Sequence, residues 1–156
     1  MIKSLSREII ARSRLIWASF RSLPLWVQIW VAAILVPVNA YAFLMLDTPA
    51  GRWTAVAALF VVATNLPIMA VYCGMNRAMS IPHLIAWIPL EIFLVRLLLK
   101  GGIAFSDPGF LFTAAVLAVN GISLVFDAAD SWRWWRGERE TPGIQGMVTE
   151  KKGSIG

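Results

Sequence analysis

The acidic residue Glu91 interrupts a long apolar stretch, and its position makes it the first candidate for chemistry. Leucine, isoleucine, phenylalanine and tryptophan dominate its surroundings between Pro82 and Leu99. If this stretch crosses a bilayer, a charged carboxylate at its midpoint is costly unless it is protonated, paired or hydrated. A carboxyl group held in that way can take up and release a proton near neutral pH. Glu91 is therefore the leading candidate for proton or cation handling.

Amide and hydroxyl side chains accompany Glu91 in three other apolar segments, on one helical stripe per segment. These candidates are Gln28, Asn39, Asn65, Asn120 and Ser123. Counted at about 1.5 Å per residue from the expected segment ends, Asn65, Glu91 and Asn120 share a depth near the midplane. Asn39 shares a level farther out with Arg96. These groups either bond the helices to one another or line a path for protons, cations or a small solute.

His83 is the only histidine, and it falls near the expected cytoplasmic boundary at the depth of Asp127 and Gln28. We expect His83 and Asp127 to form a hydrogen-bonded pair at this mouth, as a contact between helix ends or as an entry group for protons. A zinc site needs three or four suitable ligands, and no such cluster exists in the sequence. Paired haem histidines would require a homodimer.

Motifs of the common enzyme classes are also missing. The sequence has no Gly-rich phosphate loop, no GxSxG element and no CxxC pair. We therefore expect no metal, no cofactor and no catalytic residue. A membrane-embedded enzyme ranks third among the functions considered.

Composition explains which elements must position these residues. Of 156 residues, 58% are hydrophobic and only 15% are charged, more apolar surface than a soluble domain of this length can bury. Four apolar segments are each long enough to cross a bilayer as a helix, namely 25–46, 53–72, 82–99 and 110–129. Unbroken apolar runs exclude a β-barrel, whose strands alternate in polarity. The sequence predicts an all-α integral membrane protein with a four-helix transmembrane bundle over residues 25–136.

The basic residues predict the orientation of this bundle. Of the 14 lysine and arginine residues, eleven lie before the first segment, in the loop after the second, or after the fourth. Cytoplasmic segments accumulate such residues, so both termini are predicted to be cytoplasmic and the protein to lie in the inner membrane. Ala40-Tyr41-Ala42 could instead end a cleaved signal peptide, which would leave three spans in the same orientation.

The two ends of the chain carry interfacial residues. Residues 1–24 are predicted to form a basic amphipathic helix at the cytoplasmic interface, with cations toward anionic head groups. The expected anchors are Arg7, Arg14, Arg21 and Trp17 at this end, with Trp132, Trp134 and Trp135 after the fourth segment. Tryptophans and arginines are common at membrane boundaries, and no nucleic-acid-binding pattern accompanies them. Residues 137–156 are predicted to be a flexible tail.

Together these features favour a non-enzymatic multi-pass membrane protein. Its expected role is an accessory or assembly subunit of a membrane complex, or a self-associating bundle. Its expected partners are the anionic bilayer, further copies of itself or other membrane subunits, and no nucleic acid. The alternative is a small transport protein for protons, cations or a solute that uses Glu91 at the midplane.

Overall fold

A computed structural model describes the backbone of residues 2–100 and 107–144, and side chains from residue 8 onward within those ranges. Throughout these ranges the secondary structure is helical, with no strand. The elements are α1 (Ile2–Ser22), α2 (Leu25–Ile29), η1 (Trp30–Leu35), α3 (Val36–Tyr41), η2 (Ala42–Leu44), α4 (Pro49–Tyr72), η3 (Arg77–Met79), α5 (Ser80–Leu99) and α6 (Pro108–Trp135). The side chain of Arg7 and the tail from residue 145 lie outside the described part.

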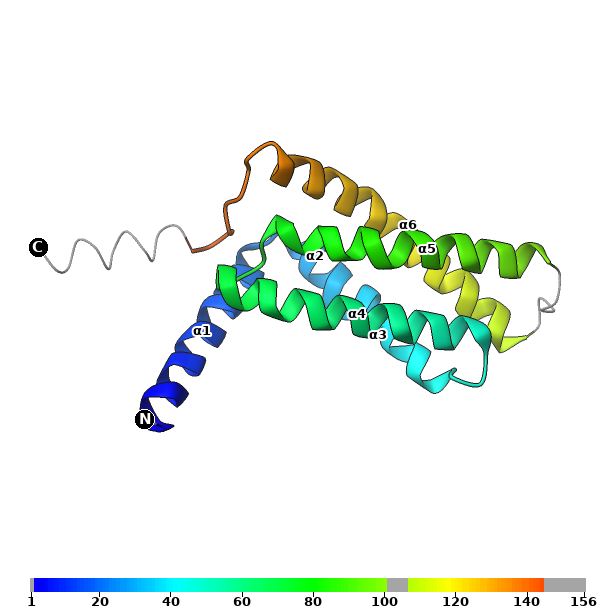
Figure 1. The fold of residues 1–156 in the computed structure, drawn as a ribbon, viewed down its shortest axis with the longest axis horizontal. Coiled ribbons are helices and arrows are strands. Elements are labelled where there is room, and N and C mark those ends of the chain that lie inside the picture. Colours follow the sequence, from blue (N-terminus) through cyan, green and yellow to red (C-terminus); the bar gives the residue numbers. More distant parts are fainter. Residues whose placement is uncertain (1, 101–106, 145–156) are drawn as a thin grey trace, which may run out of the picture.

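Four of these helical stretches are long and apolar enough to cross a membrane. They are Leu25–Leu44, Pro49–Tyr72, Arg77–Leu99 and Pro108–Trp135. They lie alongside one another as a bundle, and α1 projects from one end of it (Figure 1). The prediction of four apolar helices is confirmed. The placement of α1 at a membrane interface remains a prediction.

The bundle has two distinct ends (Figure 1). At the α1 end, α4 and α6 finish at Tyr72 and Trp135, and η3 leads into α5. At the far end, α4 and α6 begin at Pro49 and Pro108.

Capping residues, rather than the loss of hydrophobicity, set the helix starts at the far end. The Thr48 hydroxyl oxygen accepts a hydrogen bond from the Gly51 backbone N–H at 3.0 Å, and Asp107 accepts one from Gly109 at 2.6 Å. Each cap precedes a proline, which is favourable in a first helical turn. α4 therefore begins four residues before the expected Trp53.

The first candidate membrane-spanning helix, Leu25–Leu44, is irregular around Pro37. The backbone N–H of Val36 donates to the carbonyl of Val31, five residues back, which makes η1 a π-helical turn. Proline lacks an N–H and its ring clashes with the preceding turn, so a wider turn accommodates it. The extra residue changes which side chains after Pro37 face the other helices.

The apolar core occupies the half of the bundle nearer the far end. Ala42, Leu94 and Val116 have no exposed surface, and Phe112 is 6% exposed. These residues come from η2, α5 and α6, so the core joins elements that are distant in sequence. Polar side chains lie mainly in the other half.

The last turns of α1 are bonded to the α1 end of the bundle. The Ser19 hydroxyl, fully buried, accepts a hydrogen bond from the Met75 backbone N–H at 2.9 Å. Gly74 lies so close to Ser19 that a side chain at position 74 would collide with it. Arg12 donates to the Ala70 carbonyl at 3.3 Å, near the end of α4. These contacts hold α1 to the end of α4 and to the loop between α4 and α5.

Candidate functional site

A three-residue hydrogen-bonded chain crosses the bundle near the α1 end. The Asn65 amide nitrogen lies 2.9 Å from His83 Nε2, and His83 Nδ1 lies 3.1 Å from Asp127 Oδ1. The amide N–H₂ donates to Nε2, so the neutral ring carries its proton on Nδ1 and donates it to Asp127. This chain links α4, α5 and α6.

The His83 ring is also held from one side. It stacks on the Trp87 indole one turn along α5, with ring centroids 4.3 Å apart and planes 12° from parallel. Two hydrogen bonds and a stacked neighbour leave the imidazole little freedom to rotate. The structure thus brings together His83 and Asp127, and it adds Asn65, which sequence reasoning placed deeper.

A second set of polar contacts joins the helical stretch Leu25–Leu44 to α6. Asn39 and Asn120 exchange two side-chain hydrogen bonds of 2.8 and 3.2 Å, and both residues are buried. Trp30 Nε1, in the same helical stretch as Asn39, donates to the Ser123 hydroxyl of α6 at 3.1 Å. These contacts are of the kind that bonds membrane helices to one another.

Of the expected midplane residues Asn65, Glu91 and Asn120, two are bonded to side chains outside that group. Asn65 bonds His83, and Asn120 bonds Asn39. The expected end of the fourth segment, residue 129, lies six residues before the observed end of α6 at Trp135, so the depth expected for Asn120 was too small. From the observed ends, Asn39 is fourteen residues after the start of α2 and Asn120 fifteen before the end of α6, so they are level.

Glu91 lies slightly more than two helical turns farther from the α1 end than His83, facing α6. A side chain added at Gly121 would have its Cβ 3.7 Å from Glu91 Oε2. Oε1 is buried and makes no hydrogen bond with the described residues. The carboxyl group thus packs against the backbone of α6, where glycine leaves room for it.

Further buried polar atoms in the described part of the chain make no hydrogen bond there. They are Thr54 Oγ1, Asn65 Oδ1, Trp87 Nε1, Asp127 Oδ2 and Trp134 Nε1. Beyond Glu91, toward the far end, the interior is closed by the fully buried Leu94 and Val116. Beyond these two apolar side chains, the hydroxyl-bearing residues Thr54 and Thr113 are again fully buried, near the far end.

Gln28 does not join His83 and Asp127. Its amide nitrogen donates to the carbonyls of Arg21 and Leu23, at 3.1 and 2.7 Å. These carbonyls lie at the end of α1 and in the turn before α2, where intrahelical donors are lacking. Gln28 thus stabilises the bend between the two helices.

A polar network at the α1 end was not anticipated. Arg77 contacts Asp130 at 3.1 Å and Glu138 at 3.6 Å, and the hydroxyls of Ser80 and Ser131 lie 2.7 Å apart. The signal was available, because Asp127, Asp130 and Ser131 continue the polar stripe of α6 at helical spacing. The expected end of that helix at residue 129 concealed it.

The expected interface anchors lie near the same end. Arg14, Arg21, Trp17, Trp132 and Trp135 are exposed. Trp134 is half-buried, with the Arg139 guanidinium 4.6 Å from its ring centroid. Whether these side chains contact lipid stays a prediction.

Neither a metal site in the described residues nor a known relative indicates which reaction or ligand this chain serves. Among the described residues, no group of three His, Cys, Asp or Glu side chains could hold a metal ion. Comparisons with family models, curated proteins and solved structures give no match. The fold alone defines the class, an all-helical protein with four helices compatible with a multi-pass membrane bundle.

Proposed function

We propose that this chain is a non-enzymatic multi-pass membrane protein, an accessory or assembly subunit of a membrane complex or a self-associating bundle. The observation that carries the proposal is the pairing of interior polar groups across helices. Asn39 with Asn120, Trp30 with Ser123, and His83 with Asn65 and Asp127 all bond one another. Such groups contribute about 0.6 kcal/mol per contact to helix association in membranes. Because these interior polar groups bond the helices of the bundle to one another, a partner protein or a second copy would contact its outer surface.

Cross-linking in native membranes tests this proposal. Starting from Cys73→Ala, single cysteines are placed at exposed positions on different helices, Val36, Leu59, Ile85 and Val125, with the buried Leu94 as control. We expect a discrete cross-linked species from one or two neighbouring positions and none from Leu94→Cys. Purification in a mild detergent should then yield a stoichiometric partner or a homo-oligomer. A monomer without cross-links at any exposed position would contradict the proposal.

A second candidate function, transport of protons, cations or a small solute, has its own supporting observation. Glu91 Oε1 is buried without a hydrogen-bond partner among the described residues, and polar side chains lead to it from the α1 end. His83 and Asp127 would admit a proton at that end, and Glu91 would accept it at the midplane. The apolar closure at Leu94 and Val116 would have to open for transfer to the far end.

Flux measurements in liposomes test this second function. Glu91→Gln keeps the shape of the side chain but cannot exchange a proton, so proton-dependent flux should fall to the level of empty liposomes. Asp47→Asn, at an exposed carboxylate between η2 and α4, is the matched control and should keep the flux of the parent. Circular dichroism would establish that all three proteins are equally helical. No flux in the parent, or equal flux in Glu91→Gln, would eliminate transport through Glu91.

A further inference from the structure

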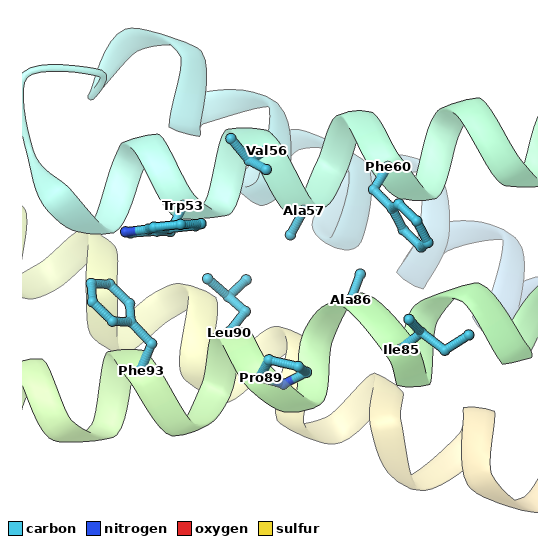
Figure 2. Close-up of a pocket in the computed structure, with 9 residues that line it drawn as sticks. All are labelled: Trp53, Val56, Ala57, Phe60, Ile85, Ala86, Pro89, Leu90 and Phe93. Carbon is cyan, nitrogen blue, oxygen red and sulfur yellow. The ribbon is translucent and has the colours of Figure 1, made fainter.

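An apolar groove runs between α4 and α5 on the outside of the bundle (Figure 2). Its volume is about 430 Å³, and its walls are aliphatic and aromatic side chains. Ala57 of α4 and Ala86 of α5 face each other across it (Figure 2). These two small side chains leave space that larger residues at the same positions would fill.

Larger side chains limit the groove along its length. Trp53 and Phe93 meet at one end with ring centroids 6.0 Å apart, and Phe60 and Ile85 lie at the other end (Figure 2). Along α4, Trp53 and Phe60 are two turns apart, a distance of about 10 Å. A narrow apolar groove of this length can hold part of one acyl chain, since one leaflet of the hydrocarbon core is about 15 Å thick.

Three cations stand beyond the Trp53 end of the groove. Arg52 directly precedes Trp53 on α4, Arg96 follows Phe93 by three residues on α5, and Lys100 follows one turn later. All three side chains are exposed, and in the described part of the chain none forms an ion pair. Three cations without an ion pair among the described residues, beside an apolar groove, are complementary to an anionic ligand with a hydrocarbon tail.

We infer that the groove and its cations bind one anionic phospholipid. One acyl chain lies along the groove, and the phosphate contacts Arg96, Lys100 and Arg52 at the far end. A partner helix fits less well, because close helix packing needs a stripe of small residues. Here only Ala57 and Ala86 are small, between aromatic ends, and a helix would leave the cations unneutralised. This inference goes beyond the proposed function and holds with or without a protein partner.

Native mass spectrometry of delipidated protein tests the inference with defined lipids. The parent should retain one phosphatidylglycerol more tightly than one phosphatidylcholine of the same acyl chains. Ala86→Phe fills the groove and should abolish this retention. Ala118→Phe, at an exposed alanine on α6, is the matched control and should bind as the parent does.

The cations are tested separately from the groove. Each is expected to contribute about fivefold in affinity, the equivalent of ~1 kcal/mol for a basic residue near anionic lipid. Arg96→Gln with Lys100→Gln should therefore weaken phosphatidylglycerol about 25-fold and leave phosphatidylcholine unchanged. Arg133→Gln with Arg136→Gln makes the same change in net charge at the α1 end, and it should preserve the preference.

Tryptophan quenching in the parent protein tests the inference without depending on whether the groove-filling variant folds. Brominated phosphatidylglycerol should quench tryptophan emission of the parent more than brominated phosphatidylcholine does, and Trp53→Phe should remove that difference. Equal retention of the two lipids by the parent would overturn the inference. So would retention by Ala86→Phe equal to that of the parent, or a dimer that dissociates on this substitution, which would make the groove a contact between two copies.

Discussion

His83→Leu should lower the free energy of unfolding by about 3 kcal/mol, one of the two largest effects expected from a single substitution. Leucine resembles histidine in volume, so the effect comes from lost hydrogen bonds rather than from a cavity. The substitution leaves Asn65 Nδ2 and Asp127 Oδ1 without their observed partner. A buried polar group deprived of its partner costs about 1–3 kcal/mol, and two groups are affected here.

Reversible unfolding in mixed micelles would measure this loss, and a double-mutant cycle would assign it. His83→Leu combined with Asp127→Leu removes both members of the pair, so no carboxyl group remains unpartnered. The double variant should be more stable than the sum of the two single losses implies, by about 1–2 kcal/mol. Strict additivity would mean that the His83–Asp127 hydrogen bond contributes nothing to stability.

Gly51→Ala should be about as damaging, at roughly 3 kcal/mol, because the new methyl group would collide with backbone. A Cβ at this position would overlap the Met45 carbonyl oxygen. That carbonyl accepts hydrogen bonds from the Thr48 backbone N–H at 3.0 Å and from its hydroxyl at 2.7 Å. Because Thr48 also caps α4 through the Gly51 N–H, the carbonyl cannot move without breaking the cap.

Gly121→Ala is the matched control for this prediction. Its Cβ would meet only Glu91 Oε2, at an ordinary contact distance of 3.7 Å. Alanine is favoured over glycine inside a helix by about 0.5–1 kcal/mol, so this variant should be equal to or more stable than the parent. Thermal unfolding of the two variants side by side distinguishes a backbone collision from a general intolerance of alanine. Similar losses in both would contradict the role assigned to Gly51.

Much of the fold could be predicted because it depends on local properties of the chain. Four apolar stretches are long enough to cross a bilayer, and the described structure has four matching helices. His83 and Asp127 were expected to pair because both lie near helix ends on one side of the bundle. Such expectations need only composition, helical periodicity and segment order.

The partners of the deeper polar residues could not be predicted, because they depend on where each helix starts, where it ends and how it is rotated. Asn39 bonds Asn120, whose depth could not be counted correctly from the sequence because α6 ends at Trp135 rather than near residue 129. The π-helical turn before Pro37 changes the rotation of Asn39, and one added residue is not visible in a hydrophobicity pattern.

The sequence by itself therefore determined the class of protein, the four apolar helices and the presence of Glu91 among them, since transfer from water to lipid depends on residue type. Only the tertiary structure decided that His83 bonds both Asn65 and Asp127 and that Glu91 packs beside Gly121. It alone placed Ala57 and Ala86 across a groove with cations beyond one end. Contacts between helices require the relative offsets and rotations of whole elements, which several caps, prolines and packed side chains set together.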